Sequence, residues 1–400
     1  MSAKPLSNQS TISTIANVAL GYWSAALTNG AMRVIVPIYF AAIGVSITKI
    51  AFLFFLFKFA EIFAPLGIGL MLNRWGYKKT FITGLAVHSI ISCFYSIPSF
   101  FLLYLERFVR GLLYMADVSA VYVKHFAPKE NQRFLINMVL GMKEASKGVG
   151  MIGGGLLIAV LSIDQTLMIF AVFTAISALV ALRYLPDLHE QVKVPVFRIW
   201  GSVGKPIKTL GLGFGLLNGA LDAWGVVVLP VFLATSLGAT PAFVGMVMMA
   251  EYILQGLIVT LFSKYVNLDW EPKKVLVAGG IILALISMGL AYAMNLYFYL
   301  AIIFIYMLFF SVLMVYYNHL MLEFASEEKT SLDLATYTTL TNVFKPVGVL
   351  VSGFLADSMG FSWAYYFAGA LALLSALTCL ALPRPRLEQT AAVGAYATGS

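Results

Sequence analysis

Two lysines lie deep within apolar segments of this 400-residue chain, and a glycine follows each of them three residues later. They are Lys147 and Lys345, and the sequences around them, 125–155 and 323–353, share seven identities when aligned without a gap. An ammonium group in hydrocarbon is costly unless it faces a cavity or a partner. Two such groups at equivalent points of a repeat predict a polar site between related helical bundles, as in secondary transporters.

Other charged residues also fall within apolar segments, and bases and acids are nearly equal in number. The bases are Arg33, Lys58, Arg107, Arg110, Lys143, Lys147 and Lys345, and the acids are Glu61, Glu106, Asp117, Glu144, Asp222 and Glu251. Spacings of three residues predict ion pairs of Lys58 with Glu61 and of Lys147 with Glu144. Two interpretations remain open, since these groups could hold helices together or could bind a solute.

Arg33 has no acid within a turn or two of its own helix, so it needs a partner from elsewhere. Guanidinium groups bind carboxylate or phosphate bidentately, and ammonium groups add point charges. This combination favours an organic anion over a cation or a neutral sugar. The residues predicted to bind substrate are Asn29, Arg33, Arg110, Tyr114, Lys143, Lys147, Asn218 and Lys345.

Several acids could carry protons. Asp117 shares a predicted helix face with Arg110 and Tyr114, so it could bind protons or simply neutralise Arg110. Asp222 could couple protons or could be the counter-charge of Arg33. The predicted proton-coupling residues are Glu61, Asp117, Glu144, Asp222 and Glu251.

The composition predicts an integral membrane protein made of helices. Hydrophobic residues make up 60% of the chain and charged residues 11%, and the mean hydropathy is +0.89. A lipid-exposed segment must satisfy its backbone hydrogen bonds internally, and about 20 apolar residues suffice to cross a bilayer. We predict twelve transmembrane helices, at 13–42, 47–72, 79–97, 100–123, 134–161, 165–184, 208–236, 241–263, 273–294, 297–322, 333–357 and 361–382.

The formal net charge of +8 reflects topology rather than nucleic-acid binding. If both termini are cytoplasmic, most lysines and arginines outside the spans fall in cytoplasmic segments, and only Lys49 falls outside the cell. This positive-inside bias predicts a multi-pass protein of the inner or plasma membrane with both termini in the cytoplasm. We therefore expect membrane lipid, protons and a small anionic solute as partners, no nucleic acid, and a monomer.

The sequence argues against an enzyme. Its four histidines are scattered, Cys93 and Cys379 lie alone in apolar segments, and no glycine-lysine phosphate loop precedes a helix. We therefore expect no catalytic residues, no metal site and no cofactor. A receptor or a lipid-moving protein on the same scaffold remains an alternative.

The longest polar stretch, 186–206, divides the chain into an N-terminal six-helix bundle (1–185), a cytoplasmic linker (186–206), a C-terminal six-helix bundle (207–383) and a disordered tail (384–400). This six-plus-six organisation resembles the major facilitator superfamily. The loop after the second span supports the resemblance, although Asn73 stands where that superfamily has aspartate. The residues of this predicted gating loop are Gly69, Asn73, Arg74, Gly76 and Lys78.

Two further motifs resemble those of the superfamily. Arg107-Phe-Val-Arg110-Gly111 is similar to its RxxxG motif, which is often tied to proton coupling. The fifth span carries Gly141, Gly150, Gly154 and Gly155, similar to the antiporter motif except that Gly155 replaces proline. The resemblance implies two pseudo-symmetric bundles around a central cavity, in which Arg33 and Lys345 would meet.

A closer resemblance covers the first, second, fifth and seventh spans. Leu27-Thr-Asn-Gly-Ala-Met-Arg33, Lys147-Gly-Val-Gly150 and Asp222-Ala-Trp are similar to segments of the permeases that export arsenylated phosphoglycerate in arsenate resistance. Those permeases show aspartate where this chain has Asn29. The resemblance implies proton-coupled export of a phosphorylated organoarsenical. Other anionic metabolites, such as a carboxylate siderophore or a sugar phosphate, and multidrug efflux are alternatives.

Overall fold

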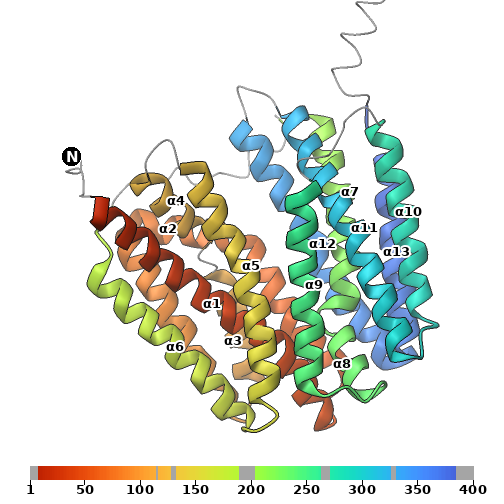
Figure 1. Cartoon of the computed structure of the whole chain (residues 1–400), viewed down its shortest axis with the longest axis horizontal. Coiled ribbons are helices and arrows are strands. Elements are labelled where there is room, and N and C mark those ends of the chain that lie inside the picture. Colours follow the sequence, from red (N-terminus) through yellow and green to blue (C-terminus); the bar gives the residue numbers. More distant parts are fainter. Residues whose placement is uncertain are drawn as a thin grey trace, which may run out of the picture. The chain divides into compact units, whose positions relative to one another are not determined.

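The computed structural model describes residues 8–113, 116–127, 132–188, 203–262, 271–325 and 330–383 (Figure 1). Within these ranges the regular structure is entirely helical, which confirms the predicted fold class. The helices of the first half are α1 (Asn8–Ala42), α2 (Ile47–Ser92), the short 3₁₀ helix η1 (Cys93–Ser96), α3 (Phe100–Leu112), α4 (Ala116–Phe126), α5 (Gln132–Leu157) and α6 (Ile163–Tyr184). Those of the second half are α7 (Lys205–Gly225), α8 (Val228–Thr235), α9 (Pro241–Phe262), α10 (Pro272–Leu290), α11 (Leu296–Phe324), α12 (Thr330–Met359) and α13 (Phe361–Cys379).

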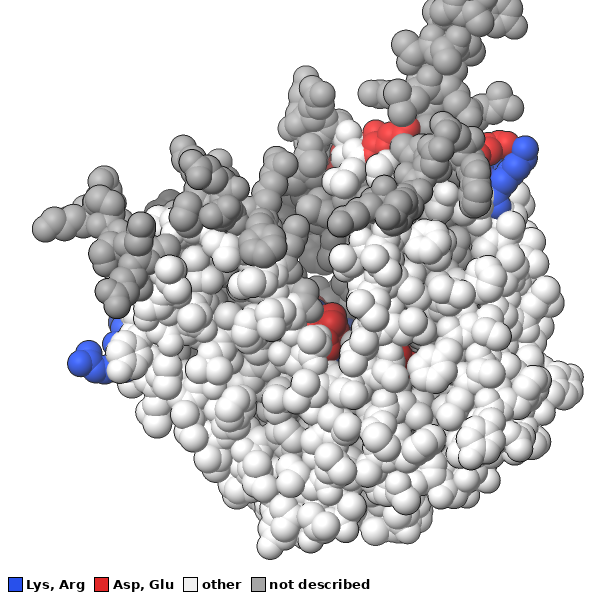
Figure 2. Space-filling model, viewed as in Figure 1, with Lys and Arg blue, Asp and Glu red and all other residues white. Residues whose placement is uncertain are grey.

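Most of these helices suit a membrane. In the described part of the chain, eight are long and apolar enough to cross a bilayer, and a bent pair within α2 makes a ninth. The bend in that pair, 58°, follows Pro65, whose missing N–H interrupts the helical hydrogen bonds. Large apolar side chains such as Leu70, Leu179 and Leu285 are more than half exposed. The bottom of the face shown in Figure 2, below the red patches near its centre, shows no red or blue atoms, as expected of a lipid-facing surface.

The observed helices can be compared with the predicted spans at three places. The second and third predicted spans, 47–72 and 79–97, lie on either side of Gly76, where α2 has non-helical backbone angles with a positive φ of 75°. The predicted span 100–123 is divided into α3 and α4, and Leu113 after α3 has non-helical backbone angles. The predicted span 208–236 corresponds to α7 and α8, which together are long and apolar enough for one span, Lys205–Thr235. A short break separates the two helices, since Pro230 cannot donate a hydrogen bond to the carbonyl of Val226.

The chain divides into two compact units, which are described separately. The first unit comprises residues 1–195 and 226–256, and the second comprises 196–225 and 257–400. In the first unit, α1 packs along α5 and α6, and α2 packs against α3 and α6. A buried apolar cluster formed around Phe81, Tyr122 and Val139 lies among these helices.

In the second unit, α7 packs against α12 and α13, while α10 packs against α11 and α13. Large aromatic side chains fill its interior, with Trp224 edge-on to Tyr306 at a ring separation of 5.1 Å. The hydroxyl groups of Tyr299 and Tyr365 lie 2.6 Å apart within the same interior. Aromatic rings thus supply much of the buried area of this unit.

The sequence repeat corresponds to the same close helix contact in each unit. In the first, a Cβ added to Gly30 of α1 would overlap the carbonyl of Lys147 in α5, and one added to Gly150 would overlap the carbonyl of Leu27. In the second, Gly219 of α7 lies against the carbonyl of Phe344 in α12. The Asn-Gly pairs and the Lys-x-x-Gly segments therefore pack against each other in both halves of the sequence.

Parts of the predicted organisation fall outside the described residues. These include most of the linker, at 189–202, and the tail, at 384–400. The domain boundaries therefore stay a prediction.

The glycine contacts predict a sharp difference between two neighbouring substitutions in α5. Gly150→Ala should lower the free energy of unfolding by about 1–3 kcal/mol, because the new methyl group would force α1 and α5 apart. Gly153→Ala is the matched control, since its methyl group would make only an ordinary contact with Phe170 at 3.8 Å. Thermal unfolding of the purified variants measures both effects, and equal stabilities would contradict the close contact.

Candidate functional site

A small cavity within the first unit gathers most of the buried cations predicted from the sequence. The residues that line it are Asn29, Arg33, Phe54, Phe57, Lys58, Glu61, Arg107 and Lys147. Four of the eight side chains are basic and one is acidic, so the lining is strongly positive. The space open to the centre of a water molecule is about 30 Å³, which is room for roughly two waters.

Close backbone packing brings these side chains together. Gly30 lies against the backbone of Lys147, so α1 presents Asn29 and Arg33 beside the lysine of α5. Gly111 of α3 likewise lies against the carbonyl of Phe57 in α2. Helices of a membrane bundle approach this closely only where small residues line the contact. The glycines of the sequence motifs thus determine where the charges meet.

Arg33 bonds to the α9 helix. Its guanidinium donates a hydrogen bond to the hydroxyl of Tyr252 and lies 5.8 Å from the centre of that ring. The neighbouring Glu251 is 5% exposed and lies close enough to Arg33 for their charges to attract. Arg33 therefore has an acid nearby, contributed by a different helix.

The predicted ion pairs of α2 and α5 are present. Lys58 Nζ lies 3.4 Å from Glu61 Oε2, and Lys147 Nζ lies 3.1 Å from Glu144 Oε2. Glu144 also pairs with Lys143 at 2.7 Å, so one carboxylate serves two lysines. The charges of Arg33 and Lys58 both act on Lys147, and the cluster retains excess positive charge after its pairs are counted.

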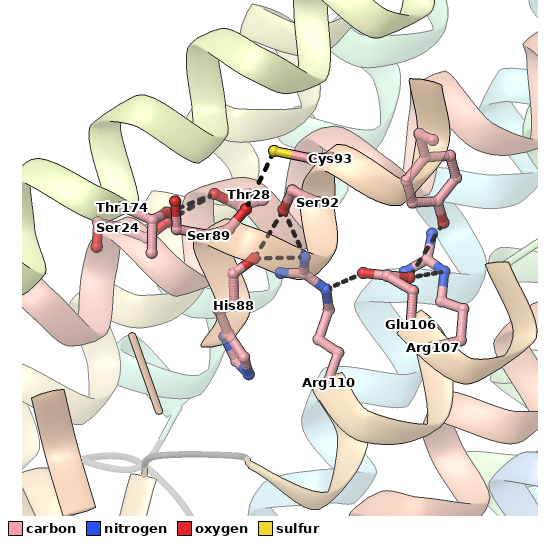
Figure 3. Close-up of polar contacts among 11 residues, drawn as sticks. Ser24, Thr28, His88, Ser89, Ser92, Cys93, Glu106, Arg107, Arg110 and Thr174 are labelled. Carbon is pink, nitrogen blue, oxygen red and sulfur yellow. Dashed lines mark hydrogen bonds and ion pairs between the residues drawn. The ribbon is translucent and has the colours of Figure 1, made fainter. Parts of the chain in front are cut away.

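A second network lies in α3, where Glu106 stands between two arginines (Figure 3). Arg110 forms an ion pair with Glu106, and its Nη2 donates to the carbonyl of His88 at 3.1 Å and to the hydroxyl of Ser92 at 2.7 Å. Arg107 Nε lies 3.6 Å from the other carboxylate oxygen of Glu106. These bonds anchor α3 to α2 in the interior.

The two arginines of this network have different surroundings. Arg110, which the sequence predicted as a substrate residue, is fully buried and is not among the cavity-lining residues. Arg107 lines the cavity, with its guanidinium 4.5 Å from the ring centre of Phe54. The predicted site did not include Arg107, although it is the arginine of the RxxxG motif, which could have identified it.

The sequence predicted one continuous helix with Arg110, Tyr114 and Asp117 on a shared face. In the structure α3 ends at Leu112 and α4 begins at Ala116, so Arg110 and Asp117 belong to different helices. Tyr114 lies outside the described residues, and Asp117 is described only as a position in α4.

The remaining predicted site residues lie in the second unit. Asp222 of α7 is 8% exposed, and Asn218, one turn before it, donates to the carbonyl of Phe214 at 2.9 Å. Lys345 is half-buried in α12, the helix that packs on α7. Asn218 and Lys345 therefore occupy packed helices as Asn29 and Lys147 do. The predicted encounter of Arg33 with Lys345 stays a prediction.

The predicted gating loop lies within α2. Gly69 is buried, whereas Asn73 and Arg74 are exposed and Lys78 is half-buried. Gly76 provides the left-handed backbone turn between these residues. The adjacent N–H of Tyr77 donates to the carbonyl of Leu188 at 2.9 Å, and this bond joins the loop to the chain after α6.

The family of the chain follows from its sequence. The model of the Major Facilitator Superfamily matches residues 18–221 and 211–396, and the chain belongs to this superfamily. It is thus a multi-pass membrane transporter rather than an enzyme. A comparison with curated protein sequences finds no match. No group of three or more metal-binding side chains occurs among the described residues.

Solved transporter structures share the fold at low sequence identity. A bacterial homologue of the human lysosomal transporter Spinster has a TM-score of 0.75 at 11% identity, covering 94% of this chain and 96% of its own. The nucleoside transporter NupG has a TM-score of 0.70 at 14% identity, covering 92% and 99%. The human organic anion transporter MFSD10 has a TM-score of 0.64 at 13% identity, also covering 92% and 99%. At such identities the likeness shows the fold alone.

The network in α3 predicts that Glu106 is essential for stability. Glu106→Gln should lower the free energy of unfolding by about 3–5 kcal/mol, because it leaves two buried arginines without their carboxylate. Glu61→Gln is the control, since the Glu61 side chain is 19% exposed and is paired with one base rather than placed between two. Unfolding midpoints of both variants in the same detergent test this, and an equally mild effect of both would contradict the role given to Glu106.

Proposed function

We propose that the protein is a secondary active transporter that moves a small organic anion across the inner or plasma membrane by alternating access. The observation that carries this proposal is the excess of bases at the cavity. Four basic side chains and one acidic side chain line it, and Glu144 and Glu106, the acids beside Lys147 and Arg107, are each shared with a second base. In a low-dielectric interior, such an excess of positive charge favours an anion as counter-charge. A solute that carries phosphate or carboxylate supplies it, whereas a cation or a neutral sugar does not.

The acids beside these bases suggest how protons are coupled to transport. Glu251 lies near Arg33, Glu144 pairs with Lys143 and Lys147, and Glu61 pairs with Lys58. Protonation of such a carboxylate removes the internal counter-charge and leaves its base available to the solute. Release of the solute then favours loss of the proton, so binding of the proton and of the anion is linked. This linkage carries both in the same direction and gives no support to export.

Glu61, Glu144 and Glu251 are therefore the proton carriers that the geometry supports best. Asp117 and Asp222 remain additional candidates from the sequence.

The direction of transport and the particular solute rest on the resemblance of the motifs. Segments around Asn29, Lys147 and Asp222 resemble permeases that export arsenylated phosphoglycerate, so we propose proton-coupled export of a phosphorylated organoarsenical. Such a solute has a phosphate and an acidic arsenical group, and the cavity has several cations. The positive-inside distribution of charge supports an orientation with both termini in the cytoplasm.

The proposal predicts proton-dependent anion flux. Purified protein in proteoliposomes should transport labelled 3-phosphoglycerate, used as a probe, faster under an imposed pH gradient, and an uncoupler should abolish the stimulation. Arg33→Ala and Lys147→Ala should each reduce the flux to that of empty liposomes while folded protein remains. Arg33→Lys should also transport poorly, because a point charge does not reproduce the bidentate fork.

Double variants separate substrate binding from simple charge neutralisation. If Lys147 only neutralises Glu144, then Lys147→Ala combined with Glu144→Ala should restore transport, since removing both members of a buried pair can be nearly neutral. The proposed role predicts no restoration. The double variant Arg33→Ala with Glu251→Gln provides the same comparison for Arg33. Wild-type flux in both double variants would contradict an anion-binding role for Arg33 and for Lys147.

A further inference from the structure

Arg107 is a buried arginine of the first unit whose guanidinium has hydrogen-bonding capacity that the described protein does not use. Nε and Nη2 of Arg107 have no hydrogen-bond partner among the described residues, although the residue is only 2% exposed. A buried charged donor left unsatisfied costs at least about 1–3 kcal/mol. Native structures contain few such groups, and they often mark a role in binding or chemistry.

The nearby Glu106 does not satisfy these donors. Its Oε2 lies 3.6 Å from Arg107 Nε, which is too far for a hydrogen bond, and accepts the hydroxyl of Tyr95 at 3.3 Å. Its Oε1 is bonded by Arg110 (Figure 3). Glu106 therefore balances charge for two arginines but completes the hydrogen bonding of neither, since Arg110 Nη1 is also buried without a partner among the described residues. Glu106, Arg107 and Arg110 together therefore carry a net charge of one positive unit. What distinguishes Arg107 is that it lines the cavity.

The unused donors belong to a side chain that lines the cavity. The ring of Phe54 lies against the guanidinium, 4.5 Å from ring centre to Cζ, and this stacking restricts how the group can turn. Asn29 lines the same cavity, and the Nδ2 group of its side chain is the part that can donate to an anion there. The cavity, with space for about two waters, can take the oxygens of one acidic group but not a whole organic solute.

We propose that Arg107 is the residue that holds one acidic group of the transported anion, through a bidentate contact from Nε–H and Nη2–H, with the Asn29 amide beside it. This inference rests on the proposed function, since it names the group through which the anion is held. Carboxylate and phosphate both match the guanidinium fork. A single negative group at this position neutralises the remaining charge of Glu106, Arg107 and Arg110. Arg107 therefore has the solute-binding role, and Arg110 has a structural one.

The test measures anion binding to the full-length protein in detergent by isothermal titration calorimetry. The probes are inorganic phosphate, glycerate, glycerol 3-phosphate and 3-phosphoglycerate. Arg107→Lys keeps the positive charge beside Glu106 but loses the fork, and should weaken binding at least about ten-fold. Arg110→Lys is the matched control, one turn away on the same helix. It should lower the unfolding temperature but leave the affinity of the folded protein unchanged.

The probes also identify the group that Arg107 holds. Weaker binding of glycerol 3-phosphate and inorganic phosphate, with unchanged glycerate, assigns phosphate to Arg107, and the reverse pattern assigns carboxylate. If folded Arg107→Lys and Arg107→Gln both bind every probe as the wild type does, Arg107 is not a ligand, although the proposed function still stands. If the wild-type protein binds none of the probes, the proposed anion function fails, and the role of Arg107 fails with it.

Discussion

The burial of positive charge among apolar helices is the constraint on which the rest of this structure depends. A membrane interior stabilises a guanidinium or an ammonium only through carboxylates, polar groups or a ligand. The first unit supplies carboxylates in part, with Glu144 shared by two lysines and Glu106 shared by two arginines. The sharing of these carboxylates between bases is the reason why we propose an anionic solute as the remaining counter-charge.

Close helix packing turns this constraint into a defined site. Without the glycines that bring α1 to α5, Asn29 and Arg33 would not lie beside Lys147. The same type of contact joins α7 and α12, where Gly219 lies against the backbone near Lys345. The sequence repeat thus contains both the glycines of the close helix contact and the lysine that this contact positions. This explains why the glycines and lysines recur at the same spacing in both halves.

The sequence predicted those features that depend on neighbours along one helix. The pairs of Lys58 with Glu61 and of Lys147 with Glu144 follow from a spacing of three residues, and both are observed. Features that depend on contacts between helices were not predicted. The bond from Arg33 to Tyr252 joins residues more than 200 positions apart, and no periodicity reveals which of Arg107 and Arg110 lines a cavity. Arg110 was predicted to bind substrate partly because it shared a helix face with Tyr114 and Asp117. The end of α3 at Leu112 interrupts that face.

If the cavity selects its ligand by charge, ligands of similar size and different charge should differ in binding. Glycerol 3-phosphate, glycerol and choline are, respectively, an anion, a neutral polyol and a cation. The increase in unfolding temperature that each produces in the purified protein reports its binding to the folded state. We expect glycerol 3-phosphate to stabilise the protein, less so as salt is added, and glycerol and choline to have no effect. Equal stabilisation by choline would contradict binding of an anion in a positive cavity.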